Sequence, residues 1–245
     1  MYRLARLSLC LLLAACASAA LAQAEAPRTI KVDGRRNPGD VPYKFFWEGQ
    51  KQLRGWLPSE PRVLDFSYRI LFTELTERQS DVYLPRSWGV SVVGDGFDED
   101  IKVRRGGYFT LDYLQAALDD DDALIMFKEQ TARRSIGVAW TVRVGAGQRI
   151  AYADLRKAIS EVHAVQLMIT PQNNSLRTLK RTGYDGLKAC FLKPDGDIRI
   201  DGAPGATGRV GNCLLLKYDD KLQDSATTIE FVGPLDIVTL VETRL

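Results

Sequence analysis

Segments in which large apolar residues occupy every second position constrain the fold of this chain most. In the clearest segment those residues are Ile136, Val138, Trp140, Val142 and Val144. Residues 64–70 alternate in the same way. Because successive side chains of a β-strand point to opposite faces, this pattern predicts strands that bury one face and leave the other more polar.

Residue patterns predict further strands and one helix. The expected strands are residues 88–92, 101–103, 109–111, 124–127, 187–192, 198–200, 212–218, 227–232 and 235–241. Between residues 153 and 169 the apolar residues, Leu155, Ile159 and Val162 among them, recur at spacings of three and four. This spacing predicts an amphipathic helix that ends before Pro171.

These patterns predict a β-rich α+β fold. A β-sandwich-like region over residues 28–147 is expected to precede an α+β region over residues 148–245, in which the helix packs on an antiparallel sheet clipped by a disulfide. The boundary rests on Gly145-Ala146-Gly147, where the periodicity changes. One continuous domain is the alternative, because a chain of this length can bury one large core or two smaller ones.

Turn residues predict two local features of the chain. Pro194-Asp195-Gly196 combines residues that favour a tight turn, and we expect it to fold residues 187–200 into a β-hairpin. Leu111, Leu114 and Leu118 suggest a short helix before the acidic run of residues 119–122. Carboxylates oppose the dipole at a helix C-terminus, so the acidic run is expected to be a solvated loop.

The first 24 residues have the layout of a secretory signal peptide. Arg3 and Arg6 precede an apolar run over residues 7–15, and small residues follow. Ala22-Gln23-Ala24 predicts cleavage before Glu25. The apolar run is too short to span a bilayer, which takes roughly 20 apolar residues.

The same segment contains an alternative cleavage site. Leu13-Ala14-Ala15-Cys16 resembles the lipobox of bacterial lipoproteins, and cleavage there would leave Cys16 as a lipidated N-terminus. The expected location is therefore periplasmic or secreted, with an outer-membrane lipoprotein as the alternative. No transmembrane segment is expected, and a membrane anchor is expected only if Cys16 is lipidated.

The cysteines predict a disulfide. Of the four cysteines, Cys10 and Cys16 lie in the signal segment, which leaves Cys190 and Cys213. A lone cysteine pair in an exported protein is most often oxidised. Closing this loop is expected to stabilise the fold by about 3 kcal/mol on the chain-entropy argument.

The charge balance argues against nucleic acid as a partner. Cleavage after residue 24 removes two of the 33 basic residues and none of the 31 acidic ones, so the mature chain is formally neutral. A neutral domain lacks the positive field that attracts phosphate backbones. The basic cluster Arg104-Arg105 is interpreted as part of a solvated face. The expected partner is an unknown protein or polymer of the cell envelope.

No residue pattern predicts catalysis, a cofactor or a metal site. His163 is the only histidine and lies at the border of the helix's apolar stripe, where a surface position is expected. Residues 95–100 and 119–122 are acidic, but their spacing does not match a calcium loop, and polar loops are expected there.

Two functional hypotheses follow from the sequence. The first is an exported, non-enzymatic binding or envelope-associated protein with an unknown ligand. The alternative is a carboxylate-based hydrolase that acts on an envelope polysaccharide or on peptidoglycan, since glycoside hydrolysis needs only two suitably spaced carboxyl groups and no histidine.

Overall fold

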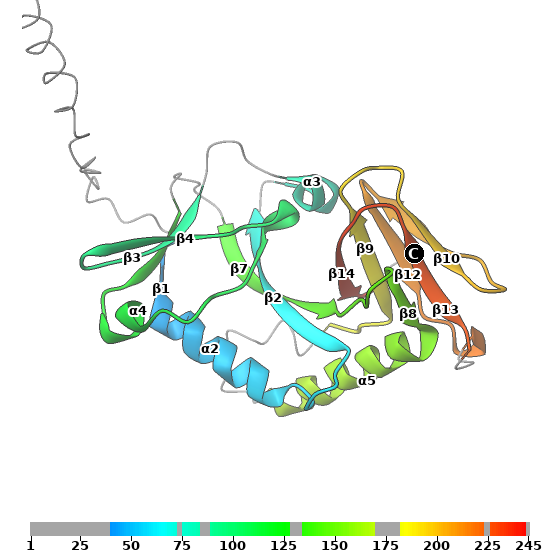
Figure 1. The fold of residues 1–245 in the computed structure, drawn as a ribbon, viewed down its shortest axis with the longest axis horizontal. Helices are drawn as coiled ribbons and strands as arrows, with labels where there is room; N and C mark the ends of the chain where they lie inside the picture. Colours follow the sequence, from blue (N-terminus) through cyan, green and yellow to red (C-terminus); the bar gives the residue numbers. More distant parts are fainter. Residues whose placement is uncertain are drawn as a thin grey trace, which may run out of the picture. The chain divides into compact units, whose positions relative to one another are not determined.

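Strands dominate the architecture of the chain (Figure 1). The computed structural model describes residues 40–72, 75–83, 89–127, 134–169, 182–222 and 226–243. These residues all belong to one unit, Asn37–Leu245, and their strands form three sheets in which every strand pair is antiparallel.

The large sheet has the strand order β11-β12-β9-β14-β7-β2-β5. Its strands are β11 (Gly208–Val210), β12 (Cys213–Lys217), β9 (Gly186–Phe191), β14 (Leu235–Val241), β7 (Arg134–Val142), β2 (Leu64–Phe72) and β5 (Tyr108–Phe109). The sheet thus combines strands from both sides of residues 145–147. The division of the chain at these residues stays a prediction.

The remaining strands form two smaller sheets, and they alternate along the sequence with strands of the large sheet. The four-stranded sheet contains, in order, β1 (Val41–Pro42), β6 (Leu124–Phe127), β3 (Val90–Gly94) and β4 (Phe97–Ile101). The three-stranded sheet contains β10 (Asp197–Ile200), β13 (Thr228–Val232) and β8 (Arg149–Ala151).

Four α-helices and two 3₁₀ turns join these strands within the described residues. The elements are α2 (Tyr43–Trp56), α3 (Glu77–Val82), α4 (Gln115–Asp119), α5 (Tyr152–Met168), η1 (Arg105–Gly107) and η3 (Asp220–Leu222). Helix α5 matches the predicted amphipathic helix within about one residue at each end. Helices α2 and α3 were not predicted from the sequence.

The alternating segments bury the predicted faces. Trp140 and Val142 of β7 lie in a core with Leu155 of α5 and residues of the three-stranded sheet. Tyr68 and Ile70 of β2 lie in a second core beneath α2 and the four-stranded sheet. The opposite face of the large sheet is more polar, and it carries the residues considered below.

The predicted hairpin over residues 187–200 is wrong. The turn at Pro194-Asp195-Gly196 exists, but β9 belongs to the large sheet and β10 to the three-stranded one. Arg209 holds the turn by donating hydrogen bonds to the carbonyls of Pro194 and Gly196. A Cβ at Gly196 would lie 2.1 Å from the ring of Phe191, so glycine lets the chain pass this ring between sheets.

The β-rich α+β fold class, with helix α5 and a disulfide-clipped antiparallel sheet, is confirmed. The sandwich-like arrangement of residues 28–147 stays a prediction, because residues 28–39 lie outside the described part and α2 occupies residues 43–56. The predicted signal peptide, residues 1–24, and the lipidation residue Cys16 also lie outside the described residues.

Candidate functional site

The polar face of the large sheet begins at the disulfide. Cys190 on β9 and Cys213 on β12 are direct partners in the strand register and are bonded to each other, as predicted. Both cysteines are buried. The bond therefore fastens two neighbouring strands at their ends.

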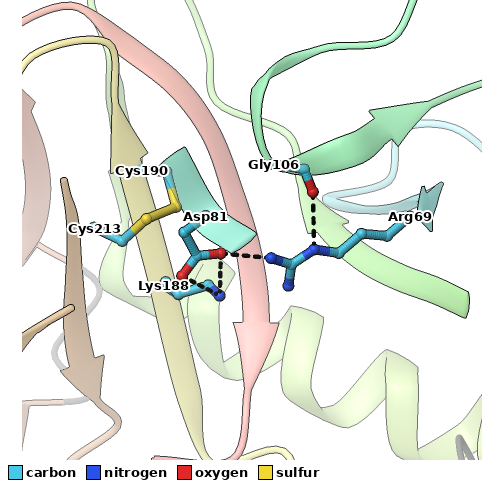
Figure 2. Close-up of a disulfide and its surroundings, with 6 residues drawn as sticks. All are labelled: Arg69, Asp81, Gly106, Lys188, Cys190 and Cys213. Carbon is cyan, nitrogen blue, oxygen red and sulfur yellow. Dashed lines mark hydrogen bonds and ion pairs between the residues drawn. A yellow bond between two sulfur atoms is a disulfide. The ribbon is translucent and has the colours of Figure 1, made fainter. Parts of the chain in front are cut away.

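A buried cluster of charges lies beside the disulfide (Figure 2). Asp81 of α3 receives hydrogen bonds from Nζ of Lys188 at 2.9 and 3.1 Å and from Nη2 of Arg69 at 2.7 Å. Arg69 also lies over the ring of Tyr108, with 4.8 Å between its guanidinium carbon and the ring centroid. Together these contacts attach α3 to strands β9 and β2.

Local sequence positions α3 for this contact. Thr76 accepts a hydrogen bond from the backbone N–H of Gln79, whose side chain in turn accepts one from the backbone N–H of Thr76. This reciprocal capping box starts the helix in a defined place. Asp81 then falls one turn later, with its side chain fully buried.

The charge cluster does not fit a metal ion. Within the described residues, Asp81, Cys190 and Cys213 place ligand atoms within 4.8 Å of one another. The two sulfur atoms are bonded to each other, and a cysteine sulfur is a good metal ligand only as a thiolate. The carboxylate of Asp81 already accepts hydrogen bonds from two cations, so its role here is structural.

A short segment, Arg104–Gly107, crosses from this cluster toward the C-terminal strands, and we call it the bridging segment. Arg105 donates to the carbonyl of Leu192 at 2.9 Å. The backbone of Gly106 donates to the carbonyl of Tyr83 at 3.1 Å and accepts from Nε of Arg69 at 3.1 Å. Arg104 is exposed, as its interpretation as part of a solvated face expects, and Arg105 is half-buried; both also contact specific carbonyls.

A cleft of about 350 Å³ lies next to the bridging segment. Strands β2, β7 and β14, the connection before β8, and Arg104 provide its walls. The lining residues are Ser67, Arg104, Thr141, Val142, Val144, Gly145, Gln148, Leu235, Asp236, Ile237 and Val238. The volume is within the range of small-molecule sites.

Asp236 supplies the only carboxylate among these lining residues. The register of β14 against β9 shifts between Leu235 and Ile237, so Asp236 occupies a β-bulge. Its carboxylate lies 2.8 Å from Nη2 of Arg104, which also donates to its backbone carbonyl. Bulges redirect side chains and are common beside functional sites. Here the bulge brings an anion and a cation together at the cleft.

Gln148 is held in an unusual backbone conformation at the cleft. Its φ is 54°, a positive value that no other non-glycine residue adopts in the described part of the chain. Its side-chain oxygen accepts from the backbone N–H of Leu235 at 3.0 Å, and its carbonyl accepts from Phe231 at 2.9 Å. Such strain costs about 1 kcal/mol or more and concentrates at functional sites.

Two further carboxylates, Glu60 and Asp65, share Arg143 at one end of β2. Nη1 of Arg143 lies 2.8 Å from Glu60, and its Nη2 lies 2.7 Å from Asp65. Burial by itself raises the pKa of Asp65, but hydrogen bonds from Arg143 and from the Phe66 backbone bring that pKa below its ordinary value. Hydrogen bonds from the Arg62 backbone and from Arg143 lower the pKa of Glu60. Both groups are therefore held ionised.

The other residues singled out in the sequence lie away from the cleft. His163 is exposed on α5, as predicted. Asp98 and Asp100 lie in strand β4, so the expected polar loop is confined to the turn before them. The side chain of Asp120 accepts from the Asp95 backbone at 2.9 Å, which brings the two acidic stretches together.

Sequence reasoning did not single out Asp81 or Asp236, and it treated Arg104 only as part of a basic cluster on a solvated face. The capping-box spacing of Thr76 and Gln79 is the one local signal that could have located α3 and hence Asp81. Comparison with known proteins adds no further guide: no family model, no curated protein and no solved structure matched the chain. The geometry allows a reversible contact with a small ligand that carries complementary charges.

Proposed function

We propose that this chain is an exported, non-enzymatic binding protein of the cell envelope that holds a small ligand in the cleft. The observation that carries the proposal is the ion pair of Arg104 and Asp236, formed at a β-bulge on the cleft wall. The strained backbone of Gln148 in the same wall supports it. These features place opposite charges and strain at one concave surface, which is typical of a binding site.

Two observations support export. Residues 1–24 have the layout of a signal peptide, and a paired Cys190 and Cys213 suits an oxidising compartment. The described helices include none that is both long and apolar enough to cross a membrane. We propose a periplasmic or secreted location, with lipidation at Cys16 as the alternative.

The carboxylate-based hydrolase is the second candidate from the sequence. Glycoside hydrolysis needs two carboxyl groups facing one space, one of them with a raised pKa so that it can donate a proton. In the cleft Asp236 is the single carboxylate, and the pKa values of Glu60 and Asp65 are lowered. These observations favour the binding protein over the hydrolase.

Fractionation of a bacterium that expresses the full chain tests the export proposal. We expect the protein outside the cytoplasm, with an N-terminus at Glu25 when intact mass is measured. A diacylated Cys16 would replace soluble export by lipid anchoring. An unprocessed chain in the cytoplasm would overturn export altogether.

Ligand retention by the purified mature chain tests the binding proposal. The protein is incubated with a small-molecule extract of the envelope, desalted and denatured, and released compounds are identified by mass spectrometry. Gly145→Trp is expected to abolish retention, because Gly145 lines the cleft and its added Cβ meets no atom closer than 3.8 Å. Gly55→Trp is the matched control, since Gly55 is an exposed residue of α2 with open space around it.

Two outcomes of this assay would contradict the proposal. One is that no compound is retained by the wild-type chain; the other is that both tryptophan variants retain it equally. Release of soluble fragments from purified peptidoglycan by the wild-type chain, lost in Asp236→Asn, would support the hydrolase instead.

A further inference from the structure

We infer that the cleft takes a zwitterionic ligand with an aliphatic body, of the class of α-amino acids and short peptides. This inference rests on the proposed function and adds the chemistry of the ligand to it. It depends on three properties of the cleft: one cation and one anion at its wall, uncharged polar side chains near them, and a surface of branched aliphatic side chains.

The charged pair matches a zwitterion because each partner keeps hydrogen-bonding capacity. The bonds from Arg104 to Asp236 use Nη2, and a guanidinium carries further N–H donors on Nε and Nη1. The carboxylate of Asp236 accepts through Oδ1, and an ionised carboxylate has further lone pairs. A ligand carboxylate pairs with the guanidinium fork, and a ligand ammonium pairs with the carboxylate.

The exposed fractions of the Arg104 and Asp236 side chains differ. The side chain of Arg104 is 47% exposed, whereas that of Asp236 is 9% exposed. The anion is thus fixed in the wall by its bulge, and the cation covers it from the solvent side. Because the pair is neutral as a whole, it offers no net attraction to a simple anion.

The rest of the lining suits the body of an amino acid. Ser67 and Thr141 contribute hydroxyl groups, which can donate to a ligand carboxylate. The remaining large side chains are branched aliphatics: Val142, Val144, Leu235, Ile237 and Val238. No aromatic ring lines the cleft, so the stacking surface that a sugar ring commonly uses is missing from it. An aliphatic side chain of the ligand would bury apolar area against these residues.

Calorimetric titration of the mature chain with four defined compounds tests the inference. L-leucine carries both charges, N-acetyl-L-leucine lacks the ammonium, L-leucinamide lacks the carboxylate, and D-glucose is a neutral polyol. We expect L-leucine to bind, and loss of either charge to weaken binding by at least about tenfold, the effect of one charge-assisted hydrogen bond.

Two variants assign each charge to its partner. In Asp236→Asn the loss of affinity caused by N-acetylation should vanish, because the carboxylate that pairs with the ligand ammonium is gone. In Arg104→Gln the penalty for amidation should vanish for the corresponding reason. Lys44→Gln and Asp121→Asn are matched controls, since they remove an exposed ion pair on the α2 side of the molecule and should leave all four affinities unchanged.

The outcomes separate this inference from the proposed function. If envelope compounds are retained in the cleft but L-leucine does not bind, or D-glucose binds in its place, the zwitterion is wrong and the binding protein stands. Equal affinity for L-leucine and N-acetyl-L-leucine would also overturn the inference. If the wild-type chain retains no envelope compound, both the proposed function and this inference are wrong.

Discussion

Lys188 and Asp81 form a buried ion pair across 107 residues of sequence. The ammonium of Lys188 lies 2.9 and 3.1 Å from the two carboxylate oxygens, and neither side chain is more than 2% exposed. A third partner, Arg69, donates to the same carboxylate. The carboxylate of Asp81 therefore compensates the charges of the buried Lys188 and of the half-buried Arg69.

Replacing Asp81 is expected to destabilise the protein strongly. Asp81→Asn keeps the shape of the side chain but removes the negative charge that Lys188 and Arg69 contact. Breaking a buried pair by removing one partner typically costs about 3–5 kcal/mol. The free energy of unfolding from urea denaturation measures this loss. The double variant Asp81→Leu/Lys188→Met is the control and should lose less than Asp81→Leu alone.

Local signals in the sequence predicted most of the strands, helix α5 and the disulfide. They did not predict the short strands β1, β8 and β11, and the expected strand over residues 101–103 is wrong because β4 ends at Ile101. The alternation in β2 and β7 reflects one buried and one polar face, which is a property of a few consecutive residues. The spacing of Leu155 and Val162 likewise reports one buried face of α5. The pairing of Cys190 and Cys213 followed from counting, because the signal segment holds the other two cysteines.

Helix α2 was missed because its local signals conflict. Tyr43, Phe46, Trp47, Gln50 and Leu53 follow helical spacing, but the helix starts without a side-chain cap and contains two glycines. Contacts distant in sequence hold it instead. The hydroxyl of Tyr43 donates to the carbonyl of Asp112 at 2.6 Å, and the amide of Gln50 donates to that of Leu111 at 2.9 Å.

The candidate site was beyond sequence reasoning for a related reason. Arg104 and Asp236 are 132 positions apart, and no spacing rule links residues that only the sheet brings together. Gly233-Pro234 separates β13 from β14. The bulge two residues later, which aims Asp236 at the cleft, depends on the pairing of β14 with β9.

Removal of the disulfide is expected to cost about 3 kcal/mol of stability. The bond closes a loop with a sequence separation of 23, and the cost follows from the larger conformational freedom of the opened unfolded chain. Cys190→Ala/Cys213→Ala should therefore unfold at lower urea concentration than the wild type. Peptide mapping without reduction should detect the linked peptides in the wild type. Free thiols at both positions after purification from the envelope would contradict the pairing.

A core position of β7 and the surface position directly after the strand should respond very differently to substitution. Trp140 is fully buried, and Trp140→Ala is expected to lose about 3–5 kcal/mol through the cavity it leaves. Arg143 is 41% exposed and makes surface ion pairs, so Arg143→Leu should lose about 1 kcal/mol or less. Thermal and urea denaturation measure both changes. Comparable losses in the two variants would mean that the buried face of β7 is assigned wrongly.

Arg143 should also control the response of the protein to acid. It lowers the pKa values of Asp65 and Glu60, so both carboxyls bind protons less readily in the folded chain than in the unfolded one. Their contribution to stability is complete above the unfolded pKa of about 4 and is lost as the pH falls through the lowered folded pKa. The free energy of unfolding of the wild type should therefore fall more than that of Arg143→Leu between about pH 6 and about pH 3. Parallel curves for the two proteins would show that Arg143 does not set the ionisation of these carboxyls.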